Sequence, residues 1–190
     1  MKKDNAIQIA TSNLRYGIGV TKEVGMDFKD MGVKRVLVIT DENLINLSPV
    51  KVAIISLKKE GIDFEVFSDV RVEPNDISFL KAINFAKEGK FDAFLAVGGG
   101  STIDTAKVAN LYSTYPTDLM TYVNAPIGKG LPVPGPVKPL IAVPTTAGTG
   151  SETTGVSIFD ISDMHVKTGI ASRFLKPTLA IVDPENTKDM

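Results

Sequence analysis

Residues 93–107 read AFLAVGGGSTIDTAK, and this stretch decides the fold. An apolar run of strand length meets three consecutive glycines at 98–100 and is followed by residues typical of a helix start. The glycines permit positive φ values and a close approach of the backbone to a ligand. Ser101 and Asp104 have the spacing of a capping box. The stretch therefore predicts a strand, a tight turn and a helix.

The start of that helix is a candidate phosphate site. The N–H groups in the first turn of a helix have no partner within the helix, and anions bind there readily. The alternative is a purely steric role for the glycines, because many strand-to-helix turns use glycine without any ligand. A glycine turn alone does not decide between a phosphate site and a purely steric role, so evidence from the other segments of the chain is needed.

The first part of the chain alternates between strand-like and helix-like stretches. Apolar runs typical of strands lie at 36–39, 64–67 and 91–97, and helical apolar spacing lies at about 50–60, 77–88 and 101–112. Gly61 and Gly89 stand where the first two helices would end. This order predicts a parallel sheet. The expected fold class is therefore α/β, a Rossmann-like parallel sheet with helices on both faces, joined by a small β-hairpin region.

The second part of the chain begins with a segment rich in proline and glycine at 126–139, which excludes a helix or a central strand there. It is either a surface loop or the border of a site. A strand is expected at 140–143, followed by the polar loop PTTAGTGSETTG at 144–155. Further strands are expected at 156–159, 165–170 and 179–182. The first two of these would pair as a hairpin with Ser162 and Asp163 in the turn.

Composition limits the classes of function. The 190 residues are 43% hydrophobic, which is enough for a core, and the length favours one domain. The 21 Lys and Arg nearly balance the 22 Asp and Glu, so the net charge of −1 gives no general attraction to nucleic acid or to an anionic membrane. Cysteine is absent, which is compatible with a reducing compartment, and the cytoplasm is the expected location. The sequence shows neither a signal-peptide core nor an apolar run of about 20 residues.

Asp41 directly follows the strand expected at 36–39, at its carboxyl end. An acid in this place can accept hydrogen bonds from both ribose hydroxyls of adenosine. In the usual dinucleotide fingerprint the glycine turn comes first and the acid follows about 20 residues later, whereas here the acid precedes the glycines. Ribose and pyrophosphate would then be bound by different βα units of one sheet. The alternative is a helix cap or a solvated turn residue.

The loop at 144–155 offers hydroxyls and backbone amides suited to a phosphate, a ribose or a carboxamide. The preceding strand would hold this loop at the same sheet edge as the three glycines, which argues against a solvated linker. Lys107 follows Asp104 by three residues, and we expect a local ion pair without a chemical role.

Two long motifs resemble the amino-terminal half of the iron-containing (group III) alcohol dehydrogenases. They are GGGSTIDTAK at 98–107 and PTTAGTGSETT at 144–154, and Asp41 supports the match. Shorter stretches resemble the hydroxyacid-oxoacid transhydrogenase branch of that family: SNLRYG at 12–17, TKEVGMD at 21–27, VRVEP at 70–74, ANLY at 109–112, APIGKG at 125–130 and SETTGV at 151–156. The resemblance covers essentially the whole chain.

The resemblance implies an NAD-binding domain over residues 1–190, of the dehydroquinate synthase-like amino-terminal type, with the carboxy-terminal helical metal-binding domain absent. It implies that Asp41 contacts the adenosine ribose. The implied cofactor-binding residues at the pyrophosphate are Gly99, Gly100 and Ser101, with their neighbours Gly98 and Thr102. Those implied on the nicotinamide side are Thr145, Thr146, Thr149 and Thr154, and Asn75 and Lys167 also match positions that approach the cofactor.

The resemblance also implies an activity. The family transfers hydride between nicotinamide C4 and an alcohol or aldehyde, with a divalent metal, Fe or Zn, polarising the oxygen. In the transhydrogenase branch the bound cofactor is reduced by 4-hydroxybutyrate and reoxidised by 2-oxoglutarate, giving succinic semialdehyde and 2-hydroxyglutarate. The implied partners are the dinucleotide and a small hydroxy or oxo acid or alcohol. The resemblance leaves a homodimer open, and the branch leaves a mitochondrial location open beside the cytoplasm.

The chain departs from the family in its metal ligands. Those ligands are an aspartate and usually three histidines of the carboxy-terminal domain, whereas this sequence has one histidine, His165, in the strand expected at 165–170. Catalytic metals usually take about three protein ligands, so we expect His165 to be a surface residue and no metal or catalytic residue in this chain. We therefore expect weak or no activity from the chain alone.

Three alternatives stay open. The first is an alcohol dehydrogenase of the same family that uses a simple alcohol or aldehyde and exchanges free NAD(H). The second is a non-catalytic nucleotide-binding module, which the missing histidines permit. The third is a fragment that folds poorly and associates through an exposed interdomain face.

Overall fold

The computed structural model describes residues 13–188, within which six parallel strands form one sheet and two strands form an antiparallel hairpin. The sheet has the order β1-β8-β5-β4-β2-β3. Its strands are β1 (Leu14–Tyr16), β2 (Arg35–Ile39), β3 (Asp63–Phe67), β4 (Ala93–Gly98), β5 (Leu140–Pro144) and β8 (Leu179–Val182), and the hairpin is β6 (Val156–Ile161) and β7 (Val166–Ala171). The α-helices are α1 (Val24–Asp30), α2 (Ser48–Lys59), α3 (Asp76–Gly89) and α4 (Gly100–Thr114). The short 3₁₀ helices are η1 (Val20–Glu23), η2 (Leu119–Thr121), η3 (Arg173–Leu175) and η4 (Pro184–Asn186).

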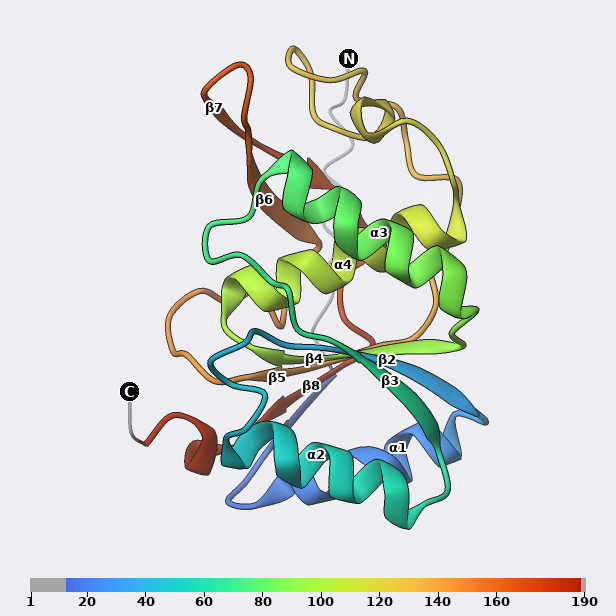
Figure 1. The fold of residues 1–190 in the computed structure, drawn as a ribbon, viewed down its shortest axis with the longest axis vertical. Helices are drawn as coiled ribbons and strands as arrows, with labels where there is room; N and C mark the ends of the chain where they lie inside the picture. The colour runs from blue at the N-terminus through green and yellow to red at the C-terminus, as the bar shows by residue number, and fades with distance from the viewer. Residues whose placement is uncertain (1–12, 189–190) are drawn as a thin grey trace, which may run out of the picture.

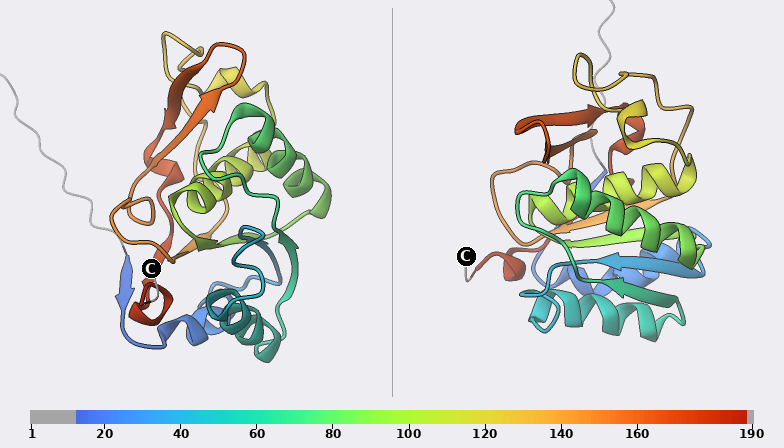
Figure 2. Two further views of the ribbon diagram at one scale, coloured as in Figure 1. Left: turned by 60° about the vertical axis from the view of Figure 1, so that its left-hand side comes forward. Right: turned by 45° about the horizontal axis from the view of Figure 1, so that its top comes forward.

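Helices cover both faces of the sheet. α1 and α2 lie on one face and α3 and α4 on the other (Figure 1). The β6–β7 hairpin lies beyond α3 and α4, away from the sheet (Figure 2). Phe159 of β6 packs against Phe79 of α3, with 4.8 Å between the ring centroids. The α/β class, the parallel sheet and the separate hairpin are thus confirmed.

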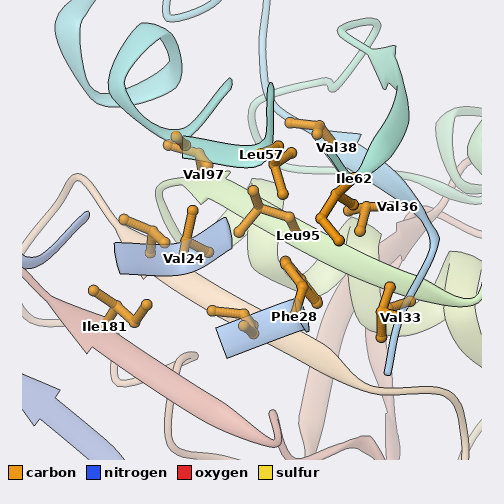
Figure 3. Close-up of a cluster of buried hydrophobic side chains, with 14 of the residues drawn as sticks. Val24, Phe28, Val33, Val36, Val38, Leu57, Ile62, Leu95, Val97 and Ile181 are labelled. Carbon is orange, nitrogen blue, oxygen red and sulfur yellow. The ribbon is translucent and has the colours of Figure 1, made fainter. Parts of the chain in front are cut away.

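The central strand β4 has two buried faces. All six of its residues are buried, and successive side chains point to opposite sides of the sheet. Leu95 joins Phe28 in the cluster between the sheet and α1 and α2 (Figure 3). Phe94 joins Ile103 in the cluster under α3 and α4. A continuous apolar run, rather than an alternating one, is what this double burial requires.

Every strand and helix expected from the sequence is present, with its ends shifted by at most two residues. β1 and α1 were not expected, since they have only three and seven residues and show too little periodicity to detect. The segment at 126–139 contains neither helix nor strand, as its prolines require.

The predicted capping box at Ser101 and Asp104 is wrong. Gly99 is the N-cap of α4, and no side chain caps that helix. The Ser101 hydroxyl accepts a hydrogen bond from the backbone N–H of Glu73 instead, at 3.2 Å. The Asp104 carboxylate accepts one from the backbone N–H of Ile158, at 3.0 Å. Tertiary contacts use both side chains, so the first-turn N–H groups of α4 stay without a local cap.

The two ends of α3 and the start of β7 also differ from the sequence prediction. The capping box lies at the start of α3, where the Asn75 side chain accepts from the N–H of Ser78 and the Ser78 hydroxyl accepts from the N–H of Asn75. Gly89 is the last residue of α3 rather than its stop, and Lys90 takes the left-handed cap with φ of 52°. His165 lies in the hairpin turn with φ of 51°, not in β7.

Asp183 connects the two ends of the described chain. Its carboxylate accepts hydrogen bonds from the N–H of Gly19 (2.9 Å), the N–H of Thr21 (3.0 Å), the Thr21 hydroxyl (2.8 Å) and the N–H of Glu185 (3.1 Å). Burial raises the pKa of this carboxyl, but the hydrogen bonds together outweigh burial and the pKa is lowered from its ordinary value. The segment after β8 is thereby fixed to the turn after β1.

A test of the packing uses Gly25, where α1 approaches α2. A Cβ at this position would lie 2.2 Å from the backbone oxygen of Ser56, so we expect Gly25→Ala to lower the free energy of unfolding by about 2 kcal/mol through overpacking. Chemical denaturation measures this. Met26, the next residue of α1, is 43% exposed, and Met26→Ala is the matched control with an expected change below about 0.5 kcal/mol. Equal effects of the two variants would contradict the close approach.

A second test uses the acid dependence of Asp183. We expect Asp183→Asn to lower the free energy of unfolding at pH 7 by about 3 kcal/mol, because an amide cannot accept from donors on both sides. The lowered pKa contributes stability above the ordinary value of about 3.9, and that contribution is lost as pH falls through the folded value. The two proteins should therefore converge in stability as pH falls below the folded pKa of Asp183. Denaturation at several pH values measures the gap, and a gap that does not change with pH would refute the assignment.

Candidate functional site

A cavity of about 700 Å³ opens at the carboxyl edge of the sheet. Loops that follow five strands surround it, as expected where parallel strands end together. The lining comes from Asp41 and residues of the 43–49 segment after β2, Val70 and Val72 after β3, Gly99, Gly100, Ser101 and Thr102 after β4, Thr145 and Thr146 after β5, and Glu185, Asn186 and Lys188 after β8. Asp41 and the glycine turn, distant in the sequence, thus face one space.

The N-terminus of α4 forms one wall of this cavity. A Cβ on Gly98 would lie 2.4 Å from the Thr102 hydroxyl oxygen, and one on Gly99 would lie 3.1 Å from the Thr146 hydroxyl oxygen. Glycine is therefore needed here because neighbouring side chains occupy the space. α4 has 15 residues and no side-chain cap, so its first-turn N–H groups are available to an anion in the cavity.

Asp41 forms a local turn and lines the cavity. Its Oδ1 accepts from the N–H of Asn43 at 3.0 Å and from the N–H of Leu44 at 3.1 Å. The interpretation as a turn residue is therefore confirmed, while the contact with a ribose stays a prediction for a residue that borders the cavity. Within residues 13–188, Oδ2 has no such bond and remains able to accept from a ligand.

The threonine-rich loop folds over the start of α4. The N–H of Thr145 donates to the Gly98 carbonyl at 3.1 Å, which holds the loop to β4. Thr145 and Thr146 line the cavity. Thr149 does not line it but lies against Gly100, where a Cβ would be 3.1 Å from its methyl carbon. Thr154, also outside the lining, accepts from Lys107 Nζ at 3.4 Å.

Asn75 and Lys167 lie outside this cavity. The Asn75 side chain caps α3 and its amide donates to the Ser162 hydroxyl at 3.0 Å. Asn75 borders a second cavity of about 470 Å³, together with Arg71 and His165. Lys167 is an exposed residue of β7 opposite Asp160. The structure thus brings seven of the expected residues to the first cavity, and Gly98, Thr149, Thr154, Asn75 and Lys167 stand outside its lining.

Lys107 forms the expected ion pair with Asp104, at 3.5 Å between Nζ and Oδ1, but the pair is buried instead of solvated. Lys107 has a side-chain exposure of 0% and donates to the Val156 carbonyl at 2.7 Å. Burial lowers the pKa of Lys107 and raises that of Asp104, and their mutual attraction opposes both shifts. Sequence reasoning missed this because burial of a lysine is not visible in a spacing.

Sequence reasoning also missed the walls formed by the 43–49 segment and by Glu185, Asn186 and Lys188. The available signal was position, since the first follows β2, which pairs with β4, and the second follows β8, which pairs with β5. Lys188 pairs with Glu185 at 2.9 Å.

The described residues do not fit a metal centre. Residues 13–188 contain no group of three His, Cys, Asp or Glu side chains close enough to share an ion. His165 is exposed, as expected, but it lies in the hairpin turn and not in a strand. In the same range, no helix combines the length and the apolar character needed to cross a membrane.

Comparison with known proteins agrees with this architecture. The family model for iron-containing alcohol dehydrogenase matches residues 11–184. Hydroxyacid-oxoacid transhydrogenase, mitochondrial, from Bos taurus is 64% identical over 188 residues, which are 98% of this chain and 40% of that protein. The Homo sapiens protein of the same name is 61% identical with the same coverage. The chain thus spans about two fifths of the length of these curated relatives.

Solved structures share the fold. Sulfoacetaldehyde reductase from Bifidobacterium kashiwanohense, in complex with NAD+, has a TM-score of 0.86 and 27% identity over 96% of this chain and 47% of its own. Alcohol dehydrogenase from Oenococcus oeni has a TM-score of 0.88 and 30% identity over 97% of this chain and 48% of its own. With a family match over nearly all described residues, this chain belongs to the iron-containing alcohol dehydrogenase family.

Proposed function

We propose that this chain binds NAD and forms the dinucleotide-binding part of a hydroxyacid-oxoacid transhydrogenase. The observation that carries the proposal is the single cavity bordered by Asp41, by the uncapped N-terminus of α4 and by two threonines after β5. A carboxylate acceptor and an anion site at one sheet edge suit the ribose and the pyrophosphate of a dinucleotide. The relatives' names support the transhydrogenase, and the NAD+ complex of the reductase supports the cofactor.

The proposed roles follow the lining. Oδ2 of Asp41 accepts from the adenosine ribose, while Oδ1 keeps its hydrogen bonds from the N–H groups of Asn43 and Leu44. The pyrophosphate meets the N–H groups after Gly99, where the helix dipole adds positive potential. Thr145 and Thr146, which line the cavity, provide hydroxyls on the nicotinamide side. Thr149 and Thr154 stand outside the lining and are assigned to this side by resemblance. Asn75 and Lys167 remain assigned to the cofactor by resemblance alone.

The proposed reaction moves one hydride. NAD, when bound, supplies the C4 that takes hydride from 4-hydroxybutyrate and gives it to 2-oxoglutarate, and the products are succinic semialdehyde and 2-hydroxyglutarate. The described residues orient the dinucleotide and hold its phosphates. The metal ligands of the family belong to its carboxy-terminal domain, and residues 13–188 offer no replacement for them. We therefore propose that turnover needs more than this chain.

The proposed location rests on the names of the relatives and on the composition, and the proposed assembly rests on the family resemblance. The curated relatives are named mitochondrial. A sequence without cysteine suits either the cytosol or the mitochondrial matrix, because both are reducing. We propose a homodimer as the assembly to test first.

A second candidate function is a nucleotide-binding module without catalysis. The absence of a metal-ligand group within the described residues permits it. An alcohol dehydrogenase that uses a simple alcohol and free NAD(H) is the third, since the family model does not distinguish substrates.

Titration calorimetry with NAD and with NADP tests the cofactor site. We expect the chain to bind NAD and to reject NADP, because the Asp41 carboxylate would repel a 2′-phosphate. Asp41→Asn keeps an acceptor for the turn but removes the charge, so NAD affinity should fall about tenfold while the preference over NADP disappears. Asp41→Gly removes the turn acceptor as well and should weaken NAD at least as much. Unchanged affinities for both cofactors in Asp41→Asn would refute the ribose role.

Hydride transfer without added nucleotide tests the reaction. We expect the 190-residue chain to show no reduction of 2-oxoglutarate by 4-hydroxybutyrate. When the chain is joined to the carboxy-terminal domain of the Bos taurus relative, we expect transfer with no added NAD. Chromatography of 2-hydroxyglutarate measures both. A strict requirement for free NAD in the joined protein would favour the simple dehydrogenase instead, and substantial activity of the chain alone would contradict the need for a second domain.

A further inference from the structure

The buried pair of Asp104 and Lys107 connects the helix at the cavity to the threonine-rich loop. Lys107 Nζ has three donors and three acceptors around it, which are the Val156 carbonyl at 2.7 Å, the Thr154 hydroxyl at 3.4 Å and Asp104 Oδ1 at 3.5 Å. Two of these acceptors lie in the loop or in the first residue of β6. The ammonium group is therefore satisfied only when the end of the loop stays in place.

Asp104 holds the same segment from the other side of the pair. Its Oδ2 accepts from the N–H of Ile158 at 3.0 Å, and its backbone carbonyl accepts from the Ser157 hydroxyl at 3.2 Å. The pair thus bonds to residues at the end of the loop and at the start of β6.

The loop is bonded to β4 at its start and forms a turn in its middle. At its start, the N–H of Thr145 bonds to the Gly98 carbonyl. In its middle, the N–H of Thr153 bonds to the Gly150 carbonyl at 3.0 Å. Gly150 has φ of 67°, so this part is a turn.

We infer that Asp104 and Lys107 are positioning residues that hold the 145–154 loop against the start of α4 and thereby set the affinity for the nicotinamide half of the dinucleotide. The inference rests on the proposed function. Neither side chain lines the cavity, so both act through the loop. The adenosine half depends on Asp41 and on the first turn of α4, and the pair does not touch Asp41.

A charged pair suits this task better than an apolar contact of the same volume. Apolar side chains would fill the space but would not fix the direction of the Val156 carbonyl or of the Ile158 N–H. Burying two charges is costly, and removing one alone leaves the other unpaired. A variant that tests the positioning of the loop without leaving one buried charge unpaired must therefore change both residues.

The experiment compares NAD with ADP, which contains the adenosine and the pyrophosphate but lacks the nicotinamide riboside. Titration calorimetry is run on the 190-residue chain and on three variants. Asp104→Asn/Lys107→Met removes both charges at similar volume, and Asp104→Asn alone is the milder variant. Asn110→Ala is the matched control, because Asn110 is fully buried one turn further along α4 but bonds to the backbone of Lys138 instead of the loop.

We expect the double variant to bind ADP within about twofold of the parent and NAD about tenfold more weakly, the size of one or two misplaced hydrogen bonds. Asp104→Asn should lower the ratio of NAD to ADP affinity by a smaller factor. Asn110→Ala should lower the thermal midpoint without changing the ratio. Amide hydrogen exchange at 145–158, measured without nucleotide, should accelerate in the double variant and not in Asn110→Ala.

Two results would overturn the inference. One is an unchanged ratio of NAD to ADP affinity in both Asp104 variants with unchanged exchange at 145–158. The other is an equal fall of the ratio in Asn110→Ala, which would make it an effect of general destabilisation. If the unaltered chain binds neither nucleotide, the proposed function fails and the inference fails with it, so the two failures are told apart by the parent alone.

Discussion

The parallel pairing of β4 with β2 on one side and with β5 on the other is the constraint on which the rest of the structure depends. Parallel strands end at the same edge, so the turn after β2, the glycines after β4 and the threonines after β5 must meet there. The pairing in turn depends on β4 being buried on both faces, which gives it no polar position. A slip of one residue would exchange the side chains facing α1 and α2 with those facing α3 and α4.

The loops at the carboxyl edge of the sheet are held by apolar packing at one end and by polar groups at the other. The sheet and its two apolar clusters hold the start of every loop, whereas the far ends depend on buried polar groups. Asp183 holds the segment after β8, and the pair on α4 holds the segment before β6. The hydrogen bonds of these polar groups fix the orientation of their partners, which apolar contacts do not. Burying the polar groups costs desolvation free energy. The cavity is therefore placed by hydrophobic packing and shaped by hydrogen bonds.

The sequence was sufficient for the order of the longer elements and for the parts of the cavity formed by Asp41, the glycine turn and the first threonines after β5. Doubly buried strands are long apolar runs, and Gly61, with φ of 71°, ends its helix as its residue type indicates. Three-residue β1 gave too short a pattern, and the capping box at Ser101 failed because tertiary partners competed for both side chains. The burial of Lys107 could not be read from spacing, since it depends on β6 covering a helix that is distant in sequence.

The strand order has a consequence for synthesis of the chain. β1 leaves the ribosome first, yet its partner is β8, with Leu14 opposite Ala180. About 160 residues must be made before the pair can form, which at ribosomal rates is roughly 10–30 s. During that time Leu14–Tyr16 has no partner, although the β2–β3–β4 unit can already pack on its helices. The nascent chain therefore carries Leu14–Tyr16 unpaired until β8 has been made, which is the interval in which a chaperone would have to act.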